Sequence, residues 1–225
     1  MGGKSSGERK GGRRQRAEIG RGMAERDAQI LAAASSVHGQ HEGPVRALLA
    51  AARTEGCGFI GGPGGRDFIE STEAVIRALE ALSGLLCQGA PPLEEVLAQL
   101  LELAWDAVKA SAASVRVLRS AALAGGTWTD PGPSEVATAR VCVQAHRAHQ
   151  RLVEDGAQLL RRVLRLGWGA EVPRALLELS LDRQLDALEA RVGESARAAA
   201  AAAAGLGAGT HLLSFPAPWE PPVEP

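Results

Sequence analysis

The sequence predicts an all-α fold, an elongated antiparallel bundle of three to four long helices with flexible termini. The chain has 225 residues, of which 45% are hydrophobic and 23% charged, enough for a buried core. Aromatic residues make up only 3%, and most of the hydrophobic residues are Ala and Leu, so the composition favours helices over strands. Apolar residues also recur at spacings of three and four between breaks rich in Gly and Pro.

Residues 1–22 form a basic segment. The segment contains seven Lys and Arg residues and two Glu residues, a net charge of +5, and no apolar run follows it. We interpret the segment as a basic disordered tail or a cleaved presequence. The whole chain has a net charge of −1, which argues against a nucleic-acid binder, and it contains no apolar run long enough to span a membrane.

Residues 23–65 are expected to form short Ala-rich helices and a Gly-rich linker. One helix is predicted over 24–37 and another over 44–54, with Pro44 at its first helical position. Six of the ten residues from Gly56 to Gly65 are Gly, a composition that disfavours a helix.

Residues 66–204 are predicted to be the bundle domain. The first helix is expected to begin with Ser71 or Thr72 as its cap and to fail near Gly89, and the second to run from Pro92 to Gly125. Further helices are predicted over 134–167 and 171–197, the last with Leu185 and Leu188 inward and Asp186 in solvent. The apolar stripes of the predicted helices are narrow and rich in Ala, so part of their apolar surface would stay exposed in a single bundle. We therefore expect a homodimer to bury that surface. A Pro-rich disordered tail is predicted over 205–225.

Two patterns could carry chemistry. Cys142, His146 and His149 are spaced so that all three project from one helical face, as zinc ligands can, but no fourth ligand is evident and Arg147 lies between the histidines. We favour a small buried cysteine with two histidines on the bundle surface. The segment Gly56–Gly61 matches a dinucleotide-binding pattern without the strand that this pattern needs, so we interpret it as a loop.

These considerations predict no catalytic residue, no metal and no cofactor, and therefore a protein that is not an enzyme. Trp219, in the Pro-rich tail, could belong to a short docking motif.

Four short segments carry a family resemblance. They are Ser71-Thr-Glu-Ala-Val-Ile-Arg-Ala, Leu103-Ala-Trp-Asp-Ala-Val-Lys-Ala, Ala145-His-Arg-Ala-His-Gln-Arg-Leu and Leu188-Glu-Ala-Arg. In this order and spacing the chain resembles, over about 57–195, the Smac/Diablo family of mitochondrial pro-apoptotic proteins, which are dimeric helical bundles with coiled-coil character.

The resemblance implies a transit peptide cleaved after Cys57, residence in the mitochondrial intermembrane space, and release to the cytosol in apoptosis. It also implies that the new N-terminus binds the BIR domains of inhibitor-of-apoptosis proteins. The family motif is Ala-Val-Pro-Ile, and the matching positions here are Gly58, Phe59, Ile60 and Gly61. Gly58 lacks the methyl group that fills the first pocket, so weakened binding is expected. The alternative is a cytoplasmic adaptor or scaffold that does not bind these inhibitors and uses a helix face or the Pro-rich tail.

Overall fold

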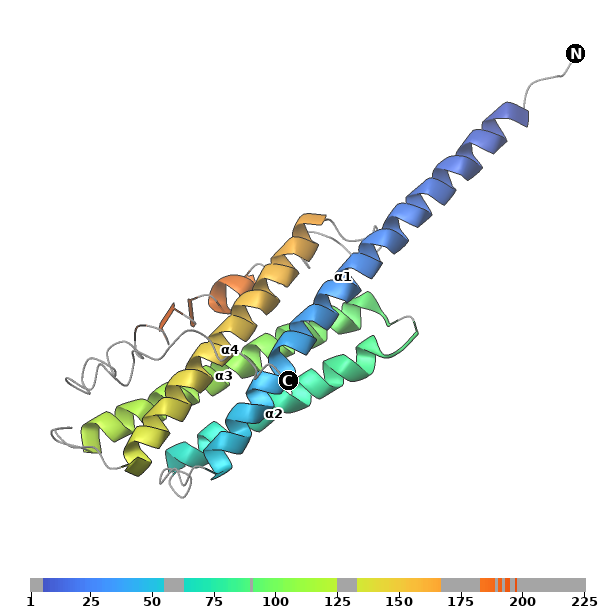
Figure 1. The fold of residues 1–225 in the computed structure, drawn as a ribbon. Coiled ribbons are helices and arrows are strands. Elements are labelled where there is room, and N and C mark those ends of the chain that lie inside the picture. Colours follow the sequence, from blue (N-terminus) through green and yellow to red (C-terminus); the bar gives the residue numbers. More distant parts are fainter. Residues whose placement is uncertain are drawn as a thin grey trace, which may run out of the picture.

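In the part of the chain that the computed structural model describes, four long helices stand out (Figure 1). They are α1 (Ser6–Thr54), α2 (Pro63–Leu86), α3 (Leu93–Ala124) and α4 (Pro133–Leu166). The structure describes residues 6–54, 63–89, 91–124, 133–166 and, in the C-terminal part, 183–188, 190, 191, 193, 194 and 197. All regular structure within these ranges is helical, which confirms the predicted fold class.

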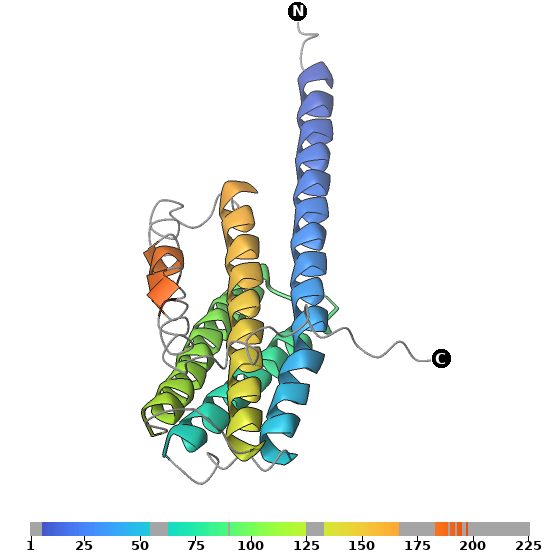
Figure 2. The ribbon, with the colours of Figure 1, turned by 60° about the vertical axis from the view of Figure 1, so that its left-hand side comes forward.

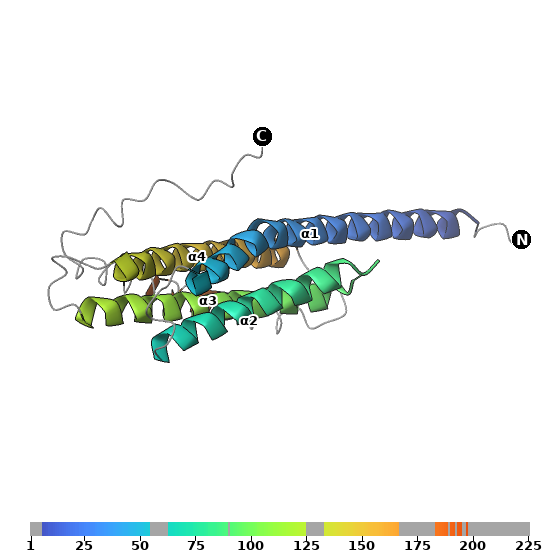
Figure 3. The ribbon, with the colours of Figure 1, turned by 60° about the horizontal axis from the view of Figure 1, so that its bottom comes forward.

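The four helices form a closed ring. Each helix packs against the next one in the chain, and α4 packs back against α1, whereas α1 and α3 lie on a diagonal with little contact (Figure 3). The helical residues 183–188 add to this bundle, because Leu185 and Leu188 are fully buried in its core and Asp186 forms an ion pair with Arg161 of α4, at 3.2 Å. The predicted inward and outward positions of this segment are therefore confirmed at these three residues.

Most helix ends lie where Gly and Pro predict them. Helices α2, α3 and α4 end at Leu86, Ala124 and Leu166, just before Gly-containing segments. The carbonyl of Pro92 accepts hydrogen bonds from the amides of Glu95 and Val96 at the start of α3. Glu94 and Glu95 occupy the first turn of that helix, where the helix dipole favours negative charge.

Helix α1 differs from the expectation. One continuous helix of 49 residues replaces the two short helices, and it begins within the segment interpreted as a disordered tail. Pro44 lies inside this helix although it removes a backbone donor. Ile30, Val45 and Leu49 of α1 are buried in the core, and this packing offsets the weak helix propensity of the sequence.

Helix α2 also begins earlier than the cap residues suggested. It starts at Pro63, so Ser71 and Thr72 lie inside it rather than at its N-terminus. Their hydroxyl groups donate to the carbonyls of Asp67 and Phe68, at 2.6 and 2.8 Å. Ser and Thr can bond to the preceding turn in this way within a helix, so the expectation of a cap at Ser71 or Thr72 was wrong.

The core consists of two apolar clusters. The larger takes residues from all four helices and includes Val75, Leu100 and Leu160. The smaller surrounds Phe68 and includes Leu48 and Leu118. No helix in the described ranges carries an apolar stretch long enough to cross a membrane.

The N-terminal part of α1 extends well beyond the other helices (Figures 1 and 2). Among the side chains whose exposure the structure describes, Ile30 is the first that is buried, and those before it, from residue 20, are exposed or half-buried. We call residues 6–29 the N-terminal arm. At 1.5 Å per residue it is about 36 Å long.

Candidate functional site

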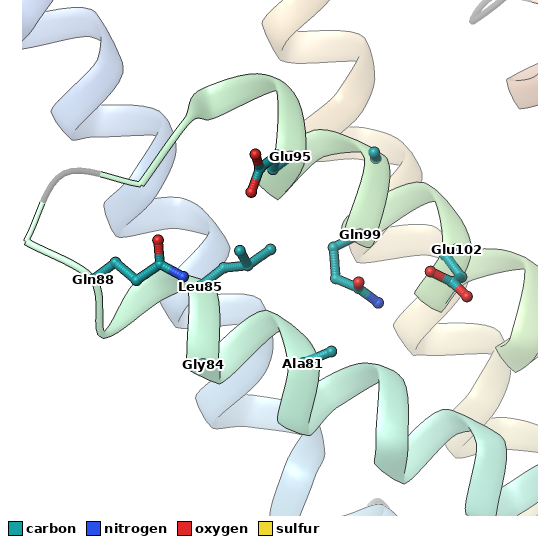
Figure 4. Close-up of a pocket in the computed structure, with 8 residues that line it drawn as sticks. Ala81, Gly84, Leu85, Gln88, Glu95, Gln99 and Glu102 are labelled. Atoms are coloured by element: carbon teal, nitrogen blue, oxygen red, sulfur yellow. The ribbon is translucent and has the colours of Figure 1, made fainter.

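A groove runs along the outer surface between the end of α2 and the start of α3 (Figure 4). Its volume is about 600 Å³. Helix α2 contributes Ala81, Gly84 and Leu85, the turn after it contributes Gln88, and α3 contributes Glu95, Ala98, Gln99 and Glu102. We call this surface the α2/α3 groove.

Small residues keep the groove open. Ala81, Gly84 and Ala98 leave space between the two helices, and a Cβ added at Gly84 would meet no atom within 4 Å. Leu85 and Gln99 point into this space (Figure 4), and the Gln99 side-chain amide reaches the carbonyl of Ala78 across it at 3.5 Å. The distance between packed helices depends on the side chains at the contact, so a third helix can approach closely here.

The groove is acidic. Glu95 and Glu102 lie seven residues apart on α3, and neither forms an ion pair with a described residue. The lining includes no Lys or Arg. The groove therefore offers two uncompensated carboxylates beside a small-residue surface.

Three carboxylates of α2 form ion pairs with the neighbouring helices. Glu80 contacts Arg46 of α1 at 2.6 Å, Glu73 pairs with Arg53 of α1, and Asp67 contacts Arg116 of α3 at 3.5 Å. The pair with Glu80 raises the pKa of Arg46 above its usual value.

The cysteine and histidine cluster on α4 lies inside the bundle. Cys142 and His149 are completely buried and His146 is nearly so. The prediction of a buried cysteine is confirmed, but the prediction that both histidines lie on the surface is wrong. Helix α4 packs against both α1 and α3, and the two histidines lie on its buried side.

The two histidines have different surroundings. The His146 Nδ1 lies 2.8 Å from the hydroxyl of Ser111 on α3, whereas neither ring nitrogen of His149 has a hydrogen-bond partner. Burial and, to a lesser extent, the nearby His146 and His41 together lower the pKa of His149 to about 3. Burial, followed by the charge of Arg147, also lowers the pKa of His146. Both rings are therefore held in the neutral form near pH 7.

A third buried histidine, His41 of α1, was not among the predicted candidates. Its Nε2 lies 2.7 Å from the Asp155 carboxylate of α4. Within the described residues, no three His, Cys, Asp or Glu side chains are placed together so that they could hold a metal ion. The arrangement of these polar residues is that of a polar layer within a helix bundle.

Several candidate residues lie outside the described residues. These include Gly58, Phe59, Ile60 and Gly61, which fall between α1 and α2, as well as Trp219 in the tail. Trp105 is described, and it packs half-buried against the larger core cluster.

No protein-family model, curated protein or solved structure matches this chain. The resemblance to the Smac/Diablo family therefore remains a prediction. The α2/α3 groove was not predicted either, although the sequence does carry a signal for it. Small residues occur on both helices, at Ala81 and Gly84 and at Ala98. In addition, Glu95 and Glu102 have no Lys or Arg three or four positions away along their helix.

Proposed function

We propose that this chain is a non-enzymatic adaptor that binds a helical segment of a protein partner in its α2/α3 groove. The observation that carries the proposal is the pair of uncompensated carboxylates, Glu95 and Glu102, beside the small residues Gly84 and Ala98. Helices commonly recognise grooves of this kind by placing an apolar stripe against the floor.

The groove specifies the chemistry of its ligand. A partner helix needs small or medium apolar residues where it faces Ala81, Gly84 and Ala98. It also needs Lys or Arg two turns apart to meet Glu95 and Glu102. Complementary charge at the edge of an interface mainly increases the association rate and the selectivity.

Binding to inhibitor-of-apoptosis proteins is the other function that the sequence suggests, and it requires cleavage after Cys57. Such cleavage would remove the whole of α1, whose Ile30, Val45 and Leu49 lie in the core. The buried faces of α2 and α4 would then be exposed to water. We therefore favour the adaptor function, with a cytoplasmic location, over the mitochondrial one.

A groove-blocking substitution tests the adaptor function. Ala98→Trp fills the groove, whereas Ala32→Trp places the same side chain on an exposed position of α1. Tagged full-length chains carrying each change, and the wild type, are used for affinity capture from cells, followed by quantitative mass spectrometry. We expect partners retained by the wild type and by Ala32→Trp to fall at least tenfold with Ala98→Trp. Equal recovery of all partners by the three chains would contradict the proposal.

A further inference from the structure

The N-terminal arm leaves the bundle at the same end as the α2/α3 groove. The ion pairs Arg46–Glu80 and Arg53–Glu73 set α1 and α2 antiparallel. The pairing implies that the groove residues Gly84 and Gln88 lie level with residues of α1 shortly after position 37. The arm begins just beyond that level and continues away from the bundle (Figures 1 and 3).

The arm and the groove have opposite charge. The arm, residues 6–29, holds seven Lys and Arg residues against four Asp and Glu residues, a net charge of +3, and five of the basic residues lie close together at Arg9, Lys10, Arg13, Arg14 and Arg16. The groove holds Glu95 and Glu102 with no cation in its lining. A basic helix is the kind of ligand that the proposed function assigns to this groove, and this chain contains one.

The arm also needs a packing partner to be stable as a helix. It contains five Gly residues, Gly7, Gly11, Gly12, Gly20 and Gly22, each of which costs about 1 kcal/mol relative to Ala in a helix. An isolated helix of this length is marginal in water even with a favourable sequence. Docking against another surface would offset this cost.

The course of α1 directs the arm away from the groove of its own chain. Helix α1 is continuous from Ser6 to Thr54 and packs against α2 and α4, so its arm points away from its own groove. Reaching that groove would require the helix to break and reverse. A second copy, related by a two-fold axis at this end of the bundle, would present its groove to the arm, and the contact would be reciprocal.

We propose that two copies of this chain form a dimer by arm exchange, with the basic N-terminal arm of each lying in the acidic α2/α3 groove of the other. The inference rests on the proposed helix-binding function of the groove and names a second copy as its occupant. The arm, about 36 Å long, exceeds the roughly 10 Å between Glu95 and Glu102 on α3, so it can cover the whole groove.

Charge reversal tests the exchange. The arm variant carries Arg13→Glu, Arg14→Glu and Arg16→Glu, and the groove variant carries Glu95→Lys and Glu102→Lys. A control carries Glu70→Lys and Glu154→Lys, exposed positions outside the groove with the same change in charge. Circular dichroism checks that all of these full-length chains remain helical, and light scattering coupled to size-exclusion chromatography gives their masses.

We expect the wild type and the control to have twice the chain mass of 23.3 kDa, and each charge-reversed variant alone to be a monomer. An equimolar mixture of the arm and groove variants should restore a dimer containing one copy of each, because both of its arm and groove contacts then pair opposite charges. A monomeric wild type, a dimeric groove variant, or a mixture that stays monomeric would overturn arm exchange. None of these outcomes alters the result that the adaptor function predicts for Ala98→Trp in the capture experiment. Arm exchange and the adaptor function can therefore be refuted independently of each other.

Discussion

The Nε2 of His41 on α1 lies 2.7 Å from the Oδ2 of Asp155 on α4, and this contact ties the first long helix to the last. The His41 side chain is 9% exposed and that of Asp155 is 42% exposed, so the contact lies at the border of the core. It shows that α1 is an integral member of the bundle.

The first prediction concerns the strength of this contact. Because Asp155 is partly in solvent, we expect a coupling free energy of about 1 kcal/mol between the two side chains. Urea unfolding of His41→Ala, Asp155→Ala and the double variant gives a double-mutant cycle. The cycle isolates the coupling free energy between the two side chains from the loss of packing. A coupling energy near zero would show that the contact does not stabilise the fold.

The second prediction concerns pH. An unfolded histidine binds a proton below about pH 6.5, whereas folded His149 does so only near pH 3 because of its burial. The unfolded state therefore binds more protons in this window, and stability falls as the pH is lowered from 6.5 towards 3, by roughly 5 kcal/mol in total. The lowered pKa of His146 acts in the same direction.

The variant His149→Leu separates the pH dependence of stability that arises from His149 from that of the carboxyl groups. Its unfolding free energy in urea should depend less on pH than that of the wild type between pH 6.5 and 4, by up to one proton per molecule. At pH 7.5 the variant should be more stable than the wild type by about 1 kcal/mol or more, because two buried nitrogens without partners are removed. Identical pH profiles for the two chains would contradict the assignment.

The sequence predicted the fold class and the ends of three helices because these depend on local signals. Stripes of Val and Leu define the helical faces, and Gly and Pro end them at Leu86, Ala124 and Leu166. Helix α1 was predicted poorly, because Gly39, Gly43 and Pro44 interrupt its pattern and only packing against α2 and α4 favours the helix there.

The candidate site was not predictable in the same way. His149 is spaced like a surface residue or a ligand, and its complete burial arises from the helices that pack on both sides of α4. The groove depends on two helices meeting at positions where both carry small residues, Gly84 and Ala98. No pattern within one helix specifies such a meeting.

The third prediction concerns Gly156, where α4 approaches α3. A Cβ added here would lie 3.9 Å from the Cβ of Ala104, an ordinary contact distance. Gly156→Ala should therefore stabilise the protein by about 0.5–1 kcal/mol through helix propensity. Gly156→Leu should destabilise it by about 1–3 kcal/mol, because the larger side chain overfills the contact. Thermal unfolding should rank Gly156→Ala above the wild type and Gly156→Leu below it in stability. A destabilised Gly156→Ala would contradict the contact distance at Ala104.

The fourth prediction links stability to binding. Gly39 and Gly84 are both exposed helical glycines with no atom within 4 Å of an added Cβ. Gly39→Ala and Gly84→Ala should each raise the unfolding free energy by about 0.5–1 kcal/mol. Only Gly84→Ala narrows the α2/α3 groove, so it alone should weaken the capture of partners and the dimer. Equal binding by both variants would exclude Gly84 from the interface.

The fifth prediction concerns processing. Leu49 of α1 is buried in the core, and Leu49→Ala should cost about 2–4 kcal/mol in urea unfolding. A chain that needs the buried residues of α1 for its core should keep them, so N-terminal sequencing of the protein from cells should find a start before Ile30, not at Gly58. A start at Gly58 would instead support the apoptotic function that the family resemblance implies.

Photo-crosslinking from the groove tests the central claim most directly. A photoreactive amino acid replaces Ala98 in the groove or Ala32 on α1, and intact cells expressing each chain are irradiated. The adaptor proposal predicts covalent products of higher mass from position 98, joined to a basic helical segment of a partner or of a second copy, and few from position 32. Absence of products from position 98, or the same products from both positions, would contradict it.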